Sequence, residues 1–326
     1  MITRALFKTL LFIGIVFTIF SCSSTDEESL TPNNNNPINP AELKLFVIDS
    51  AKINTISSLG TNEITILNRK VNSSSYIKQL SIGPNTEKIA YIDSQNAGNP
   101  SFIITNSLRV VNANGSNDTE LFSTTDHQII AIKYCTDGKI HFAKRHNTTN
   151  AVKFGTINAD GTGLQEATGY YGSIVDITND RKYILLEANT LSATPNVQII
   201  DLSLDGGAGG PYHTENFAGV DPYQIREGNF TQDGKYAVIP FKDGSDIKIR
   251  IVDMATKTAT TKVIVTGITG WASLDVELAS DSNRGVLTVM GENFTPKTNT
   301  YLFKLNDTVI TNFLNNDDTV LNVYPY

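Results

Sequence analysis

The sequence predicts an all-β fold, a β-propeller of four-stranded antiparallel blades. Three observations support this prediction. From residue 43 onward short apolar runs alternate with polar turns, no stretch there has the periodicity of a helix, and one kind of turn recurs at a regular interval. A single small sheet cannot bury both of its faces, so several such sheets have to stack around a common axis.

The recurring turn joins two strands and is rich in Asp, Asn, Gly and Lys. Asp-Gly and Asn-Gly pairs supply the positive φ angles that tight hairpins need. Five copies occur, spaced by about 43 to 53 residues, at 83–88, 136–139, 178–182, 231–235 and 280–284. Further along each unit a third strand runs into a second polar turn, as in 108–116 and 155–162. Dividing residues 43–326 by this interval favours six blades, with seven as the alternative.

The two ends of the predicted propeller each lack part of a blade. Residues 43–69 contain three strands and no recurring turn, whereas residues 319–324 form a lone apolar strand. We therefore expect the last strand to complete the first blade and close the ring.

These turns resemble those of the TolB-like β-propellers, whose blades carry the pattern Pro-Asp-Gly-Lys, strand, strand, Asn-Ala-Asp-Gly. The similarity is greatest in the segment 133–162 and in the turn 231–235, and it covers roughly residues 81–307. The resemblance implies a propeller domain, and we place it over residues 43–326.

The first 21 residues differ from the rest of the chain. Arg4 and Lys8 are their charged residues, and an apolar run covers 10–20. This run is too short to span a membrane, which takes about 20 helical residues. A basic start, a short apolar run and a small residue before the cut predict a cleaved signal peptide over residues 1–21.

Cys22 is predicted to carry a lipid. The segment 19–22, Ile-Phe-Ser-Cys, resembles the lipobox of bacterial lipoproteins, in a loose form typical of Bacteroidota, although Phe20 is larger than usual. The resemblance implies a diacylglycerol on the Cys22 sulfur, which holds the protein at a membrane. The alternative is a plain signal peptide with an incidental cysteine.

Residues 22–42 are polar and rich in Asn and Pro, which predicts a disordered tether after the lipidated cysteine. The acidic run 26–28 resembles the surface-export signal of Bacteroidota lipoproteins, and an acidic linker is the alternative. The expected location is the cell envelope, at the outer membrane, facing either the periplasm or the cell surface.

Charge and motifs exclude several functions. The formal net charge of −7 argues against a nucleic-acid partner, because phosphate binding needs clustered Lys and Arg. The sequence has no nucleophile elbow, no zinc-protease motif and no phosphate-binding loop. We expect no cofactor and no metal: His141 and His146 lack further zinc ligands, and 243–246 is interpreted as a hairpin turn in preference to a calcium loop. Cys135, left without a partner, is expected to be a buried thiol.

The candidate binding surface is the rim opposite the recurring turns. Its loops are longer and more varied, and function concentrates on such loops. The candidate ligand-binding residues on this rim are His127, Tyr171, Asp221, Tyr223, Arg226 and Trp271. The alternative is that the aromatic rings there, with those of Tyr212 and Phe217, fill the gaps between blades.

Two functions follow from these observations. The favoured one is a binding or scaffold module for a protein, peptide or glycan, with the membrane as a second partner through Cys22. The alternative is a propeller-type hydrolase, lactonase or lyase with its site at the central channel, and no catalytic residue is assigned. Its inner strands are expected at 128–134, 173–177, 224–230 and 273–278. Their polar residues are Lys133, Asp176, Arg226, Glu227, Asp275 and Glu277. Three or more of these groups meeting in one channel mouth would favour the enzyme.

Overall fold

The computed structural model describes the propeller region of the chain. The described residues are 45–49, 51–56, 64–69, 75–96, 104–169, 174–189, 192, 194–202, 211–226, 228–270, 272–290, 298–308, 310–317 and 322–325. The chain divides into two compact units, Met1–Asn35 and Asn36–Tyr326, and every described residue belongs to the second. The predicted signal peptide, lipidation site and tether lie outside the described residues.

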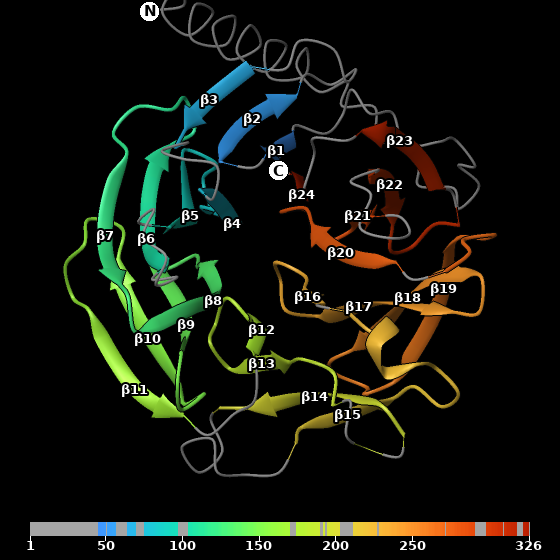
Figure 1. The fold of residues 1–326 in the computed structure, drawn as a ribbon. Helices are drawn as coiled ribbons and strands as arrows, with labels where there is room; N and C mark the ends of the chain where they lie inside the picture. Colours follow the sequence, from blue (N-terminus) through green and yellow to red (C-terminus); the bar gives the residue numbers. More distant parts are fainter. Residues whose placement is uncertain are drawn as a thin grey trace, which may run out of the picture. The chain divides into compact units, whose positions relative to one another are not determined.

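The second unit is a ring of six four-stranded antiparallel sheets, which confirms the predicted six-bladed β-propeller (Figure 1). Blade 1 contains β1 (Leu45–Asp49), β2 (Lys52–Ile56), β3 (Ile64–Asn68) and β24 (Asn322–Pro325). Blade 2 contains β4 (Tyr76–Ile82), β5 (Lys88–Asn96), β6 (Ile104–Asn112) and β7 (Thr119–Thr124). Blade 3 contains β8 (His127–Tyr134), β9 (Lys139–His146), β10 (Val152–Asn158) and β11 (Gln165–Gly169).

The remaining three blades have the same four-stranded order. Blade 4 contains β12 (Ile174–Ile177), β13 (Tyr183–Leu186), β14 (Asn196–Asp201) and β15 (His213–Asn216). Blade 5 contains β16 (Asn229–Phe230), β17 (Tyr236–Asp243), β18 (Asp246–Asp253) and β19 (Ala259–Val265). Blade 6 contains β20 (Ser273–Leu278), β21 (Arg284–Met290), β22 (Thr298–Lys304) and β23 (Ile310–Asp317). The strands β24, β4, β8, β12, β16 and β20 are the innermost strands of their blades (Figure 1).

The ring closes as predicted, because the last strand of the chain completes the first blade. β24 pairs antiparallel with β1, with Tyr324 opposite Phe46 and Val323 opposite Val47. Tyr324 is buried against Phe46 in the core between blades 1 and 2. The strand begins at Asn322, and the first residues of the predicted segment 319–324 lie outside the described ones.

The recurring turns are held by their aspartates. Asp137, Asp180 and Asp233 each accept a hydrogen bond from the backbone N–H two residues further on, at 3.1, 3.0 and 3.1 Å. In the turns of blades 4 and 5 the same carboxylates also accept from a threonine hydroxyl. These local bonds explain why the turn recurs, since each stabilises the bend before the second strand begins.

The recurring turns define one rim of the ring, here the turn rim, which also carries the links between third and fourth strands. The opposite rim, here the crossing rim, carries the links between second and third strands and the crossings between blades. This assignment follows from the alternating direction of the strands. The core lies between the blades, where apolar side chains of facing sheets pack together.

One predicted inner strand is wrong in its extent. We expected a strand over 224–230, and the structure has a 3-10 helix, η3 (Pro222–Gln224), followed by the two-residue strand β16. Pro222 presets a helical φ and has no N–H for a sheet, and the Asp221 side chain caps the turn by accepting from Tyr223 N. None of the described residues forms a helix long and apolar enough to cross a membrane.

Candidate functional site

The structure places three of the predicted site residues in one crossing. Asp221, Tyr223 and Arg226 lie between blades 4 and 5, on the crossing rim. Tyr171, Trp271 and the lipidation site Cys22 lie outside the described residues. His127 starts β8, two blades away from β16, so the described part of the chain does not bring it into this group.

The crossing between blades 4 and 5 borders a surface hollow of about 370 Å³. The residues that line it are Gly219, Val220, Asp221, Gln224, Lys242, Asp243, Gly244 and Gly270. Gln224 is 7% exposed, and its Oε1 has no hydrogen-bond partner among the described residues. The hollow therefore combines carboxylates and an ammonium group, with a buried amide side chain beside them.

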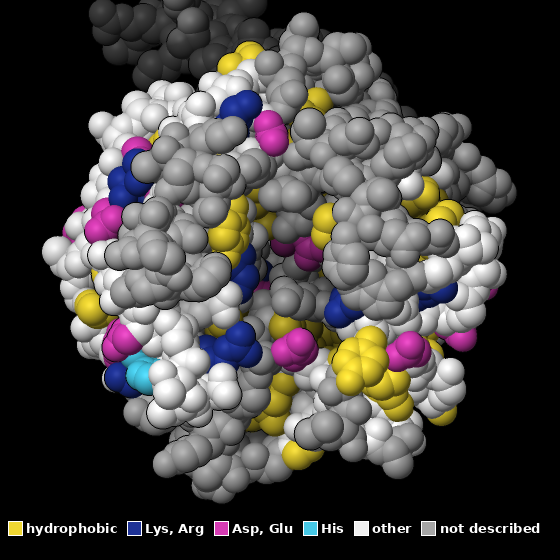
Figure 2. Space-filling model, viewed as in Figure 1, with side chains coloured by type: hydrophobic (Ala, Val, Ile, Leu, Met, Phe, Trp, Pro, Cys, Tyr) yellow, Lys and Arg dark blue, Asp and Glu magenta, His cyan; other side chains and the backbone are white. Residues whose placement is uncertain are grey.

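Tyr223 stands beside this hollow with its side chain in solvent. It is 65% exposed, the largest value among the described large hydrophobic residues. Asp221 fixes its backbone through the cap of η3, at 2.9 Å from Oδ1 to Tyr223 N. Figure 2 shows hydrophobic and acidic side chains side by side on this face, where Figure 1 has the short helix in the crossing.

Two other aromatic residues near this crossing belong to the core. Phe217 is fully buried, at 5.1 Å between ring centroids from Phe241. Tyr212 packs against Tyr183 and donates a hydrogen bond of 2.7 Å to Met254 O. The alternative interpretation of the aromatic residues is therefore correct for Phe217 and Tyr212, and it does not hold for Tyr223.

His127, one of the candidate ligand-binding residues, is buried. It is 7% exposed, and its Nδ1 lies 2.6 Å from Asp126 Oδ1. Its ring meets His146 edge to face, at 5.0 Å between centroids. The hydrogen bond with His127 lowers the pKa of the Asp126 carboxyl. Burial at the start of β8 follows from the alternation of that strand, in which His127 shares a face with Ile129.

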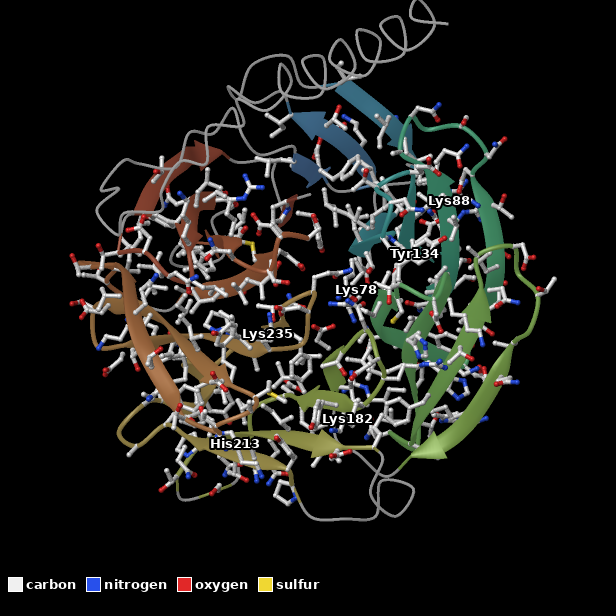
Figure 3. The ribbon with its side chains drawn as sticks, turned by 180° about the vertical axis from the view of Figure 1, so that it is seen from behind. Lys78, Lys88, Tyr134, Lys182, His213 and Lys235 are labelled. Carbon is white, nitrogen blue, oxygen red and sulfur yellow. The ribbon has the colours of Figure 1, made fainter. Side chains whose placement is uncertain are left out.

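Lys133, Asp176 and Glu277 line one mouth of the central channel, on the turn rim. Three polar groups of the inner strands therefore meet in one channel mouth, which is the condition given above as favouring a propeller-type enzyme. The space there is about 70 Å³, enough for about two water molecules. Lys133 Nζ lies 3.3 Å from Asp176 Oδ2, and the same oxygen accepts from Phe230 N at 2.8 Å. Figure 3 shows the ring from this side, with Lys78 beside the central opening.

The inner strands are also joined by side chains that bond to the backbone of the next blade. Gln79 Oε1 accepts from Ile132 N at 3.2 Å, and Ser81 Oγ accepts from Tyr134 N at 2.8 Å. Asn229 Nδ2 donates to Val276 O. Together with Asp176, these groups link β4, β8, β12, β16 and β20 in succession. Polar residues on inner strands are the only signal of this network in the sequence.

The other sequence expectations concern Cys135 and the turn 243–246. Cys135 is a buried free thiol, as predicted, and burial raises its pKa to about 12. The segment 243–246 is a hairpin turn, also as predicted. In it Lys248 Nζ lies 2.8 Å from Asp243 Oδ2 and 3.8 Å from Asp246 Oδ2. No group of three or more metal-ligating side chains occurs among the residues that the structure describes.

Comparison with known proteins finds similarity in structure alone. No protein-family model matches the sequence, and no curated protein matches it. TolB from Acinetobacter baumannii is similar with a TM-score of 0.62 and 13% identity, over 88% of this chain and 67% of that chain. A TolB from Agrobacterium tumefaciens, described as putative, has a TM-score of 0.54 and 7% identity, over 85% and 92%. An oligogalacturonate lyase in complex with manganese has a TM-score of 0.50 and 14% identity, over 80% and 74%. At these identities the similarity shows the fold, that of the TolB-like β-propellers.

Proposed function

We propose that this protein is a lipid-anchored envelope protein whose propeller binds a ligand at the crossing rim between blades 4 and 5. The observation that carries the proposal is Tyr223, 65% exposed beside the hollow lined by Asp221, Gln224 and Lys242. An aromatic ring of this size is normally covered, and an exposed one beside convergent polar groups is typical of a recognition site.

A glycan fits this site better than an apolar ligand. The Tyr223 ring offers a flat surface for the C–H face of a sugar, and the groups in the hollow can bond to hydroxyls. The carboxylates of Asp221 and Asp243 supply acceptors and Lys242 supplies donors, although Lys242 Nζ also bonds to Gly244 O at 2.5 Å. A peptide or a protein loop is the other class of ligand that the same groups accept.

The test is a screen of the propeller, residues 43–326, against glycan and peptide arrays. For the ligand found, Tyr223→Ala and Trp271→Ala should each weaken binding by roughly twofold to tenfold, because an aromatic contact contributes roughly 0.5 to 1.5 kcal/mol. The midpoint of thermal unfolding should stay unchanged for Tyr223→Ala, since its side chain is in solvent.

Leu164→Ala provides the matched control, because Leu164 is 48% exposed in a turn of blade 3 on the opposite rim. It should alter neither binding nor stability. Unchanged affinity in Tyr223→Ala, or a large loss of stability in that variant, would contradict the proposed site.

The anchor is the second part of the proposal, and the sequence alone supports it. The lipobox-like segment 19–22 follows an apolar run and precedes a polar tether. Metabolic labelling with palmitate should mark the wild type and Cys135→Ser and fail to mark Cys22→Ser. Incorporation of palmitate into Cys22→Ser would contradict the predicted lipid anchor. Protease treatment of intact cells then distinguishes a surface location from a periplasmic one.

A propeller lyase is the second candidate function. It is favoured by the meeting of Lys133, Asp176 and Glu277 in one channel mouth. It stays second because Asp176 Oδ2 already accepts hydrogen bonds from Lys133 Nζ and Phe230 N. In addition, a space of about 70 Å³ does not admit a substrate unless the channel mouth opens. If it is correct, the propeller should cleave oligogalacturonate and Glu277→Gln should lose that activity. No turnover by the wild type would exclude this substrate class.

A further inference from the structure

A cavity of about 490 Å³ lies between blades 3 and 4, away from the crossing-rim hollow. Its lining is mostly apolar. The apolar side chains are Ala131, Ile132, Phe142, Ala143, Phe154, Ile174, Ile177 and Leu202. The volume falls within the roughly 300 to 1,000 Å³ of pockets that hold small molecules.

The cavity exists because this interface is packed with small residues. Its buried core contains Ala131 and Ala143 with four aliphatic residues, and Phe154 is partly buried against it. The interface between blades 4 and 5 instead buries the rings of Phe217, Phe230 and Phe241. Ala131 and Ala143 are cross-strand neighbours in blade 3, so at this place blade 3 presents two small side chains to blade 4 and the space between the sheets is not filled.

His141 faces this gap. In blade 3 the register places Ala143 opposite Ala131 and Phe154, and His141 opposite Lys133 and Thr156. Residues two apart on a strand lie on the same face of the sheet, so His141 shares a face with Ala143. His141 is 5% exposed, and its Nε2 has no hydrogen-bond partner among the described residues. A buried ring nitrogen without a partner is costly and therefore needs an explanation.

The His141 ring is neutral at physiological pH. Burial, and then the positive charge of Arg181, lower its pKa to about 4. A neutral imidazole nitrogen bonds to a group that accepts or donates, according to the tautomer. The charged groups at the cavity are already paired, Arg181 with Asp137 at 3.1 Å, Asp176 with Lys133 at 3.3 Å and Glu166 with Lys144 at 2.5 Å. These pairs leave no opposite charge to compensate a charged ligand in the cavity.

We propose that the cavity between blades 3 and 4 binds a small apolar molecule with one hydroxyl group, which bonds to His141 Nε2. The apolar body fills the space over Ala131 and Ala143. The hydroxyl serves either tautomer of the imidazole, because it both donates and accepts. This site is independent of the crossing rim, and its failure would leave the proposed function untouched.

The test uses two probes that differ by one hydroxyl, naphthalene and 2-naphthol, with the full-length protein in equilibrium dialysis. The wild type should bind both one to one, with 2-naphthol tighter by about fivefold to tenfold, the usual net effect of one hydrogen bond. His141→Phe keeps the ring and removes the nitrogens, so it should bind the two probes equally. Ala143→Leu fills the space and should lose both.

Ala143→Leu is also the control for probe that is taken up by detergent in the sample, because the wild-type and variant samples differ in this residue alone. If it does not fold, Ala131→Leu fills the same space from β8. Tyr223→Ala should leave probe binding unchanged, which separates this site from the crossing rim. The proposal is overturned if the wild type binds neither probe, if the filled variants bind as the wild type does, or if the hydroxyl adds no affinity.

Discussion

At the scale of single residues, Gly115 shows how a turn is adapted to the neighbouring blade. Gly115 lies in the turn between β6 and β7 with a φ of 84°. A Cβ there would lie 2.0 Å from Ile66 O in β3 of blade 1. Gly138, in a recurring turn of blade 3, has a similar φ of 79° and open space around it. Only the first position therefore excludes a side chain by contact as well as by conformation.

These two glycines form a matched pair for a stability measurement. Gly138→Ala should lower the free energy of unfolding by about 1 kcal/mol, the cost of a left-handed backbone conformation for alanine. Gly115→Ala should lower it by about 3 kcal/mol or more, since the contact with Ile66 O adds to that cost. Urea denaturation of both variants measures the difference. Equal losses would show that blade 1 moves aside at this contact.

Tyr223 and His141 mark the limit of prediction at this scale. Both residues are visible in the sequence, yet the alternation of apolar residues does not tell an exposed aromatic ring from one that fills an interface. Phe217 lies six residues before Tyr223 and is fully buried. The cap at Asp221 and the fixed φ of Pro222 turn the chain out of the sheet, and that is why Tyr223 is exposed.

At the scale of elements, β24 is the strand on which the ring depends. It lies at the inner edge of blade 1, where it covers β1 and contributes Tyr324 to a buried core. Without it, the backbone groups of β1 that pair with β24 lose their partners, and an open sheet edge faces the channel.

Deletion of residues 322–326 should therefore remove the cooperative unfolding transition. Blade 1 would keep three strands, and the contacts of β24 with β20 and β21 of the last blade would be lost. Thermal and urea denaturation followed by circular dichroism test this, with deletion of Tyr326 alone as the control. A truncated protein that melts as sharply and at the same temperature as the full chain would show that the ring closes without this strand.

The hairpins were predicted well because their causes are local. Each recurring turn is stabilised by an aspartate that bonds to a backbone N–H two residues away, as Asp137 does with Lys139 N. Such bonds need no partner from elsewhere in the chain. The prediction of a strand over 224–230 was wrong for an equally local reason. Pro222 and Asp221 favour a capped turn over a strand there.

At the scale of the whole propeller, the blades are joined by groups that are distant in the sequence. Lys133 and Asp176 are 43 residues apart and meet between β8 and β12. Asp176 and Phe230 are 54 residues apart and meet between β12 and β16. We predicted these strands as candidates for the channel, but their pairings depend on how each blade rotates against the next.

The sequence by itself determined the class of fold and the closing strand and favoured six blades over seven, because turn chemistry and strand alternation are properties of neighbouring residues. The envelope address stays a prediction from the composition of the first residues. Tertiary structure alone decided that Tyr223 stands beside a hollow and that three polar groups share a channel mouth. It also decided that two alanines leave a cavity beside His141. These features depend on the volume between sheets, which is set by side chains that meet only after the ring has formed.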